Sequence, residues 1–408
     1  MNKTILLIGS FDTKGEEFSY VRDLITANGL QTLLLDTSVL GEPSGVIPDI
    51  SADQVALAGG SSLEELRRAG DRGTAVDVMI EGVKKLVQQQ YEAGNFDAVL
   101  SLGGGAGTNV ATAGMRELPV GVPKVMVSTL ASSDVSAYVG VKDITMMFSV
   151  TDIAGLNPIS RRVLANAAGA VCGMAGQQVP SAREKPLIAA SMFGVTTPCV
   201  TQVRKILEKA GYELLVFHAT GNGGRAMESL IDEGYFSGVA DLTTTEWADQ
   251  VVGGVLGAGE DRLGAAGRRK IPQVVSCGAL DMVNFHAMET VPERFRGRNL
   301  YKHNPTVTLM RTTGEECREI GRRIAEKLNQ SEGPVSLFLP LKGVSSLDTP
   351  GRPFYDPEAN QILFSSLREH LEEHVQVFEL DQHINDTEFA KAAADELLSM
   401  LETRTDSG

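Results

Sequence analysis

The sequence predicts an α/β protein of two Rossmann-like lobes, each built on a doubly wound parallel sheet, that are related by an internal repeat. Short apolar runs alternate with helical stretches along almost the whole chain, which is the βαβ pattern of a parallel sheet. The second half then repeats the order of runs and turns of the first half at low similarity. Because 408 residues exceed what one hydrophobic core usually serves, we expect one lobe at 1–180 and a second at 181–408.

The first half shows strand and helix candidates in regular alternation. Four apolar runs are expected to be strands: Thr4–Ile8, Thr32–Asp36, Ala98–Leu102 and Lys124–Ser128. Helices are expected at about Gly15–Ala27, Ala75–Tyr91 and Gly107–Arg116. A helix thus separates each strand candidate from the next, as the connection between parallel strands requires.

The second half starts the same order again after the polar stretch Pro180–Pro186. At one constant shift, the run Ile5–Gly9 aligns with Leu187–Ser191, and Asp36, which ends the second strand, aligns with His218. The runs that begin at Phe96 and Val122 also resemble the runs that begin at Phe236 and Ile271. A further βα portion from about Pro334 adds two expected strands, Val335–Pro340 and Val375–Leu380.

The composition argues against several classes of partner. The net charge of -15 disfavours nucleic acid, whose phosphate backbone needs a basic surface. No apolar run reaches the roughly 18 residues of a membrane span, and the N-terminus leads straight into a strand without a cleavable signal. We therefore expect a cytoplasmic protein without a membrane partner. The cysteines are far apart and lack CxxC spacing, so buried free thiols are expected at Cys172, Cys199, Cys277 and Cys317.

The most informative local sequence is a glycine-rich turn between a strand and a helix. It consists of Gly103, Gly104, Gly105, Ala106, Gly107 and Thr108. Glycines let the backbone approach a ligand closely, and a helix N-terminus offers unpaired N–H groups and the positive end of the helix dipole. This combination suits a phosphate or a carboxylate. The turn is neither a Walker loop nor a strict GxGxxG, and a tight turn that binds nothing is the alternative interpretation.

A second loop leaves the first strand and should lie near the glycine turn, because open parallel sheets bind ligands at the carboxyl ends of their strands. It carries Asp12, Thr13 and Lys14. Lys14 could neutralise a phosphate, and Asp12 could hold a metal, a ribose hydroxyl or Lys14 itself. An ordinary helix cap formed by Asp12 or Thr13 is the alternative. Together with the glycine turn, the loop favours nucleotide binding.

Weaker signals follow the same rule. Ser128 and Thr129 end the fourth strand, add small hydrogen-bond donors, and are included in the expected nucleotide site. The loop Asp36–Ser38 offers hydroxyls, and Asp71–Thr74 offers a cation and a hydroxyl ahead of a long helix.

The second lobe carries different chemistry on its strand-to-helix loops. Four residues there are expected to line one cleft as a catalytic group facing the nucleotide site: His218, Arg225, Glu246 and Asp281. Lys342 and Asp348 follow a later strand on the same edge. A structural role for His218, and a metal site formed by Asp241, Glu246 and Asp281, remain open as alternatives.

These residues also carry a family resemblance that covers nearly the whole chain. The stretches concerned are Asp12–Lys14, Leu102–Gly104 with Gly107–Thr108, Met192–Val200, Val216–Gly221, Gly278–Phe285, Leu309–Thr313 and His383–Asp386. They resemble the ATP-binding domain family of the tomato mosaic virus resistance protein and its bacterial and fungal relatives. The function of this family is largely unassigned.

The resemblance implies ATP in the first lobe, with contacts at Lys14 and Gly104–Thr108, and a second lobe of similar build. It also implies self-association as a homodimer or higher oligomer. Members of the family can be fused to a TIM-barrel domain; this chain ends at Gly408 without one, so a separate TIM-barrel protein is an expected partner.

Three functional hypotheses follow. The first is an ATP-binding enzyme or enzyme subunit, with or without Mg²⁺, that acts on a small anionic metabolite in the cleft between the lobes. The second is a regulatory or interaction protein that binds a nucleotide without turning it over. The third is a hydrolase or lyase that is independent of ATP and uses His218 and Asp281.

Overall fold

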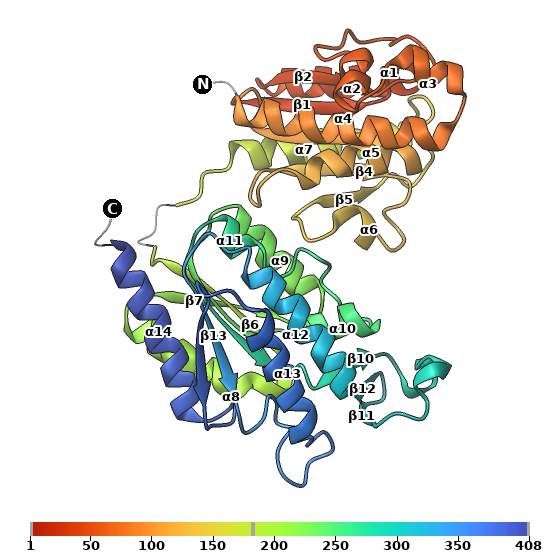
Figure 1. Cartoon of the computed structure of the whole chain (residues 1–408). Coiled ribbons are helices and arrows are strands. Elements are labelled where there is room, and N and C mark those ends of the chain that lie inside the picture. The colour runs from red at the N-terminus through yellow and green to blue at the C-terminus, as the bar shows by residue number, and fades with distance from the viewer. Residues whose placement is uncertain (1–2, 181–183, 406–408) are drawn as a thin grey trace. The chain divides into compact units, whose positions relative to one another are not determined.

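The computed structural model describes residues 3–180 and 184–405. It divides into two compact units, Met1–Ser181 and Ala182–Gly408, and each unit contains its own parallel sheet (Figure 1). No helix within the described residues is both long and apolar enough to cross a membrane.

Unit 1 is built on a five-stranded sheet in which every neighbouring pair of strands is parallel. The strands are β1 (Thr4–Gly9), β2 (Gln31–Asp36), β3 (Ala98–Gly103), β4 (Lys124–Ser128) and β5 (Thr145–Phe148). Their order is β2-β1-β3-β4-β5, so the chain builds outward on one side of β1 and then returns to build the other side. This reversal makes the carboxyl ends of β1 and β3 the switch point at which open sheets bind ligands.

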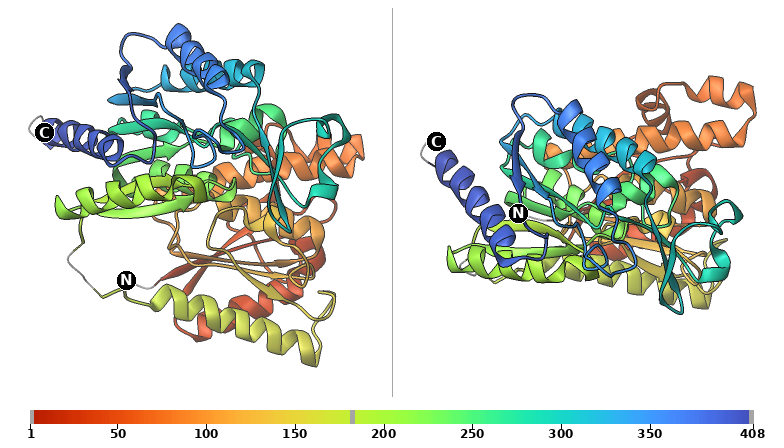
Figure 2. Two further views of the ribbon diagram at one scale, coloured as in Figure 1. Left: turned by 90° about the horizontal axis from the view of Figure 1, so that it is seen from below. Right: turned by 60° about the horizontal axis from the view of Figure 1, so that its bottom comes forward.

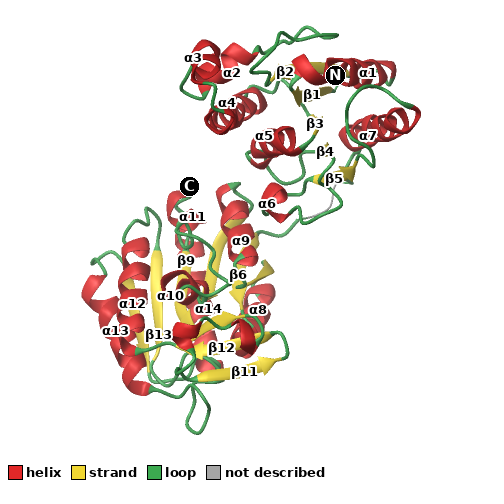
Figure 3. Cartoon of the chain, turned by 90° about the vertical axis from the view of Figure 1, so that its right-hand side faces the viewer, coloured by secondary structure: helices red, strands yellow, loops and turns green. Residues whose placement is uncertain are grey.

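Helices cover both faces of this sheet (Figure 3). They are α1 (Phe11–Ala27), α2 (Ala52–Ala58), α3 (Leu63–Ala69), α4 (Arg72–Glu92), α5 (Gly105–Arg116), α6 (Ser136–Val139) and α7 (Pro158–Gly176). Successive side chains of a strand point to opposite faces. Accordingly, Leu6 and Ile8 of β1 belong to the core beneath α4 and α5. Ile5 and Leu7 belong to the core beneath α1 and α7.

Unit 2 contains a six-stranded parallel sheet and a separate three-stranded antiparallel sheet. The parallel strands are β6 (Leu187–Met192), β7 (Glu213–His218), β8 (Phe236–Thr243), β9 (Gln273–Gly278), β13 (Val335–Pro340) and β14 (Gln376–Leu380). The antiparallel strands are β10 (Met282–Phe285), β11 (Leu300–Asn304) and β12 (Val307–Arg311), which lie between β9 and β13 in the sequence.

Helices also cover both faces of the parallel sheet of unit 2. They are α8 (Thr197–Lys209), α9 (Asn222–Asp232), α10 (Glu246–Val252), α11 (Ala265–Arg268), α12 (Gly314–Leu328), α13 (Pro357–His370) and α14 (Thr387–Thr405). On one face α8 packs against α14, which Figure 2 shows from two further sides. The other face is covered by α9 and α11 over β6 and by α10, α12 and α13 over β9 and β13.

The two units share one strand order. If the strands of each parallel sheet are numbered in chain order, the sheet of unit 1 has the order second-first-third-fourth-fifth. The sheet of unit 2, with the order β7-β6-β8-β9-β13-β14, follows the same order and adds a sixth strand at the end. The segments that align in the sequence, such as Ile5–Gly9 with Leu187–Ser191, fall on corresponding strands. The α/β fold with two Rossmann-like parallel sheets is therefore confirmed, and the expected strands lie within one residue of those observed.

Several elements differ from expectation, namely β5, the start of α1 and the antiparallel strands β10, β11 and β12. Strand β5 is short and only partly buried, and its apolar run, Met146–Phe148, is shorter than the runs that mark the other strands of the sheet. Helix α1 begins at Phe11, so Asp12, Thr13 and Lys14 lie in its first turn and not in a loop before it. The early start is explained by a contact with the end of β2, because the buried carboxylate of Asp36 accepts the backbone N–H of Phe11 at 3.2 Å. The helix is distorted at Lys14, where φ is -131° and ψ is 21°.

The expectation for the cysteines is confirmed. Cys172, Cys199, Cys277 and Cys317 are all free and buried. Burial raises the pKa of the Cys199 thiol to about 12, so this side chain is an apolar core residue and not a nucleophile at neutral pH.

Candidate functional site

A cavity of about 450 Å³ lies at the carboxyl edge of the sheet of unit 1. Side chains from residues 10–13, 37–40, 66–79 and 106–110 line it. These segments follow β1, β2 and β3 or belong to α3 and α4, so the cavity lies at the switch point of the sheet. Its volume falls in the range of about 300–1,000 Å³ that is typical of small-molecule sites. The structure thus brings Asp12 and Thr13 to the same cavity as Ala106 and Gly107.

Helix α5 begins beside this cavity without a capping side chain. Its N-cap residue is Gly104, which offers no side chain to the first backbone N–H groups. A side-chain carbon added at Gly107 would have only the carbonyl oxygen of Leu102 within 4 Å, at 3.9 Å, so the backbone there faces open space. Gly103 serves the turn itself, because a carbon there would lie 3.2 Å from Gly107. The first turn of α5 therefore combines room for a ligand with unpaired N–H groups and the positive end of the dipole.

Thr108, Ser128 and Thr129 connect two loops and do not line the cavity. The hydroxyls of Thr108 and Ser128 are buried and lie 2.7 Å apart. The backbone N–H of Thr129 donates to the carbonyl of Gly103 at 3.3 Å. These residues hold the glycine turn against the end of β4, which fixes the start of α5.

Lys14 is not among the residues that line the cavity. Its ammonium group donates to the carbonyl oxygen of Ile153 at 2.6 Å, on the loop after β5. Lys14 is thus directed to the loop after β5, and its contact with a phosphate stays a prediction. Asp12 does line the cavity, and its Oδ2 accepts the backbone N–H of Gly41 at 3.0 Å, which ties the loop after β2 to the first turn of α1.

The cavity also contains residues that the sequence reasoning did not place there. Arg67 of α3 lines it and donates its Nε to the carbonyl of Val39 at 2.6 Å. Leu40 lines it as well and is 86% exposed. The signal for α3 was present in the capping box formed by Ser62 and Glu65. Arg72, from the expected loop Asp71–Thr74, is exposed at the start of α4 and makes no ion pair within the described residues.

In unit 2, the expected catalytic carboxylate Glu246 belongs to a buried ionic cluster around Arg262. The Arg262 side chain is 1% exposed. It donates to Glu246 at 2.7 Å, to Glu228 at 3.0 Å and, through both terminal nitrogens, to Asp241. Burial, followed by the nearby negative charge of Asp241, raises the pKa of the Glu228 carboxyl, and Arg262 opposes this shift. No local pattern in the sequence marks Arg262, because its partners come from three separate elements.

Glu246 also fills the position at which the glycine-rich loop after β7 would bind an anion. Its Oε1 accepts the backbone N–H groups of Gly221 at 2.7 Å and Gly224 at 3.1 Å, at the start of α9. A side-chain carbon at Gly224 would collide with the carboxylate, so glycine is required there. Both oxygens of Glu246 are therefore bonded within the chain, which contradicts a role as a free catalytic carboxylate.

The other expected catalytic residues lie in different surroundings. His218 is exposed, and its ring contacts Phe193 edge-on with 6.5 Å between centroids. Arg225 is exposed on α9 and donates to Asn222. Asp281 is buried. The guanidinium of Arg262 lies between Asp241 and Glu246, where a metal was the alternative interpretation. Within the described residues, no group of three or more His, Cys, Asp or Glu is arranged to hold a metal ion.

Asp281 lies in a second buried cluster, after β9. Its Oδ2 accepts the hydroxyl of Ser345 at 2.7 Å, and its Oδ1 has no hydrogen-bond partner within the described residues. Asp348 accepts the side-chain amide of Asn360 at 2.6 Å, and Asn360 in turn accepts from Arg311 at 2.8 Å. Burial, reinforced by the charge of Asp348, raises the pKa of Asp281 to about 7, although Arg311 opposes the shift.

The fold and the cavity define a two-domain Rossmann-like α/β protein with a cavity at the switch point of its first sheet. The chain belongs to the family described as Uncharacterised protein family (UPF0261). The N-terminal domain model of this family matches residues 3–180, and the C-terminal domain model matches residues 185–401.

Relatives at high identity support this assignment. A UPF0261 protein of Clostridium tetani is 54% identical over 404 residues, which is 98% of this chain and 100% of that protein. The ToMV resistance protein Tm-1(GCR237) of Solanum lycopersicum is 46% identical over 337 residues, 81% of this chain and 45% of that protein, which confirms the expected relationship.

A solved UDP-N-acetylglucosamine 2-epimerase from Rickettsia bellii, at 10% identity, covers 100% of this chain and 98% of that chain with a TM-score of 0.26.

The buried position of Glu246 predicts a loss of stability when it is altered. Glu246→Gln places an amide against Arg262 and leaves the guanidinium without one of its carboxylates, so the free energy of unfolding should fall by about 3 kcal/mol or more. Urea unfolding followed by the fluorescence of Trp247, the one tryptophan of the chain, reports on unit 2. The control is Arg225→Ala, which alters an exposed side chain and should change stability by less than about 0.5 kcal/mol. Unchanged stability of Glu246→Gln would contradict a structural role.

The raised pKa of Asp281 predicts a pH dependence of stability. Between pH 3.8, its ordinary value, and about 7, the folded chain keeps a proton that the unfolded chain has released, so stability should fall as pH rises through this interval. Asp281→Asn cannot ionise and still accepts from Ser345. The variant should lose less stability than the wild type between pH 5 and pH 8, by about 1–3 kcal/mol. Equal pH dependence of the two proteins in urea unfolding would show that Asp281 is ionised throughout.

Proposed function

We propose that unit 1 binds a nucleotide, with ATP as the leading candidate, in the cavity beside α5. The observation that carries the proposal is the uncapped N-terminus of α5 at a cavity of about 450 Å³ that both expected binding loops line. Rossmann-like sheets bind nucleotides at this switch point, with the phosphates at a helix N-terminus. The relationship to the ToMV resistance protein Tm-1(GCR237) supports the proposal, because the resemblance to that family implies ATP in the first lobe.

The lining of the cavity suits the separate parts of a nucleotide. The N–H groups in the first turn of α5 are donors for phosphate oxygens. Arg72, which makes no ion pair with the described residues, adds a positive charge to the lining. Leu40 and Met79 offer apolar surface for a base, and the exposure of Leu40 leaves its side chain free to contact one. Ser10 and Thr13 provide hydroxyls. Asp12 is the carboxylate that would bind a ribose hydroxyl or a Mg²⁺ carried by the phosphates.

Filling the cavity from α5 should abolish nucleotide binding without unfolding unit 1. Gly107→Leu introduces a side chain into open space at the first turn of α5. In isothermal titration calorimetry, the affinity for ATP should fall at least about tenfold, equivalent to about 1.4 kcal/mol. Leucine is also the better helix former by up to about 1 kcal/mol, so thermal stability should not fall.

The matched control is Gly173→Leu on α7, which likewise adds a side chain to an exposed helical glycine with no atom within 4 Å. This variant should bind ATP as the wild type does. Wild-type affinity in folded Gly107→Leu would exclude the cavity as the site, and failure of the wild type to bind any of ATP, ADP, AMP and GTP would overturn the proposal.

Removing the positive charge of Arg72 should weaken the binding of phosphates selectively. Arg72→Ala should reduce the affinity for ATP by about tenfold at low salt and by less at high salt, because an exposed charge is screened. Adenosine, which has no phosphate, should bind both proteins equally. Arg162→Ala, at an exposed position on α7, is the control for a change in net charge. A parallel loss of ATP and adenosine affinity would place Arg72 away from the phosphates.

A further inference from the structure

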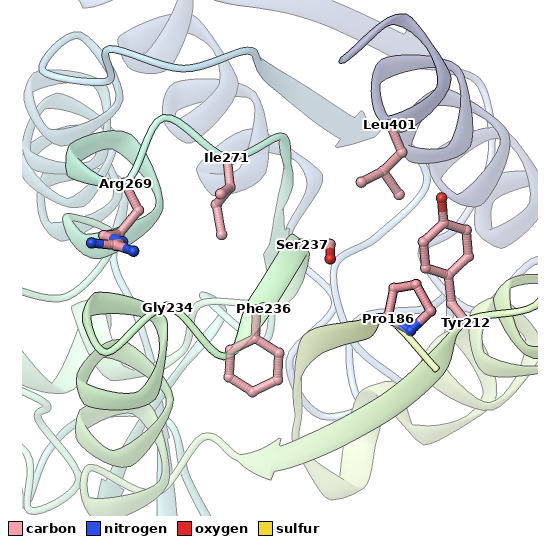
Figure 4. Close-up of a pocket in the computed structure, with 8 residues that line it drawn as sticks. All are labelled: Pro186, Tyr212, Gly234, Phe236, Ser237, Arg269, Ile271 and Leu401. Carbon is pink, nitrogen blue, oxygen red and sulfur yellow. The ribbon is translucent and has the colours of Figure 1, made fainter. Parts of the chain in front are cut away.

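Unit 2 contains a cavity of about 430 Å³ at the amino edge of its parallel sheet, the end opposite to the loops discussed above (Figure 4). Phe236 and Ser237 begin β8, Ile271 lies just before β9, and Leu401 comes from α14. Tyr212 lies just before β7. The volume of the cavity falls in the range of about 300–1,000 Å³ for small-molecule sites. The cavity does not lie at the switch point of the sheet.

The lining combines an apolar surface with donors that have no partner among the described residues. The side chains of Phe236, Ile271 and Leu401 are buried and form the apolar part. The hydroxyls of Tyr212 and Ser237 make no hydrogen bond to the described residues, and the Arg269 guanidinium makes no ion pair with them. An apolar pocket with a few convergent polar groups is the usual form of a ligand site.

Charge favours an anion in this cavity. The chain has 52 Asp and Glu against 37 Lys and Arg, yet the residues that line the cavity include one arginine and no acidic residue. Gly234 lets the Arg269 side chain lie against the backbone, because a carbon added at Gly234 would come within 2.7 Å of its guanidinium nitrogen. Gly234 also has a φ of 85°, a conformation that other residues rarely adopt.

We propose that this cavity binds a small organic anion, namely a carboxylate that carries an apolar chain or ring. The carboxylate pairs with Arg269, whose planar guanidinium matches it in a bidentate manner. The apolar part covers Phe236, Ile271 and Leu401, and the hydroxyls of Tyr212 and Ser237 bind any polar substituent. A single cation and the lack of a glycine-rich helix N-terminus make the cavity unsuited to a polyphosphate. The inference is independent of nucleotide binding in unit 1.

Octanoate, acetate and inorganic phosphate are suitable probes for calorimetry on the full chain. Octanoate should bind with one site per chain, and acetate and phosphate should bind at least about tenfold more weakly, because they lack the apolar part. Arg269→Gln should weaken octanoate binding at least about tenfold through loss of the charged partner. Ser237→Leu keeps the cation but fills the cavity, and it should weaken octanoate to a similar extent. Arg204→Gln, on the exposed surface of α8, is the control and should bind as the wild type does.

The outcomes separate a built site from a charged surface groove. Loss of binding in both Arg269→Gln and Ser237→Leu, with thermal stability retained, supports the proposal. Equal binding of acetate and octanoate, or full binding by Ser237→Leu, would reduce the site to surface ion pairing and overturn it. Absence of octanoate binding to the wild type would also overturn it, whereas ATP binding in unit 1 would be unaffected.

Discussion

The buried ion pairs of the Arg262 guanidinium are the interaction on which the rest of unit 2 depends. It joins Asp241 in β8 to Glu228 in α9 and Glu246 in α10, and Glu246 then holds the turn at Gly221. A buried charge is tolerated only when it is paired and hydrogen-bonded, because desolvation costs several kcal/mol for each ion. Three carboxylates share one cation here, so each element of the cluster must be in place for the others to be stable. The cluster therefore fixes where α9 and α10 lie relative to the sheet.

The two units share a strand order but treat their glycine-rich helix starts in opposite ways. In unit 1 the first turn of α5 is uncapped and faces a cavity. In unit 2 the corresponding chemistry at the start of α9 is satisfied by the chain's own Glu246. A carboxylate at a helix N-terminus meets the same N–H groups and dipole that a phosphate would meet. The same local sequence pattern thus yields a candidate ligand site in one unit and an internal bond in the other.

The two cavities lie at opposite edges of their sheets and differ in chemistry. The cavity of unit 1 has a helix N-terminus, two arginines, several hydroxyls and an exposed leucine. The cavity of unit 2 has one arginine beside an apolar surface, and no helix start contributes to it. Multiple donors aimed at one point suit a polyphosphate, whereas a single cation beside apolar groups suits a carboxylate. The two units are therefore expected to differ in ligand, although they resemble each other in fold.

The sequence by itself determined most strands of the two parallel sheets, the parallel arrangement, the repeat and the segments after β1 and β3 that line the cavity of unit 1. These features depend on local periodicity and on glycines between a strand and a helix, which neighbours in the chain dictate. Only the tertiary structure decided what individual side chains do. Lys14 bonds to Ile153, far along the chain, and Glu246 is held by Arg262, which no local pattern marks. Charged side chains pair with the groups that folding brings near them, and those groups lie on separate elements. Packing, and not spacing in the sequence, therefore decides which carboxylates are buried. It also decides which loops stay open to a ligand.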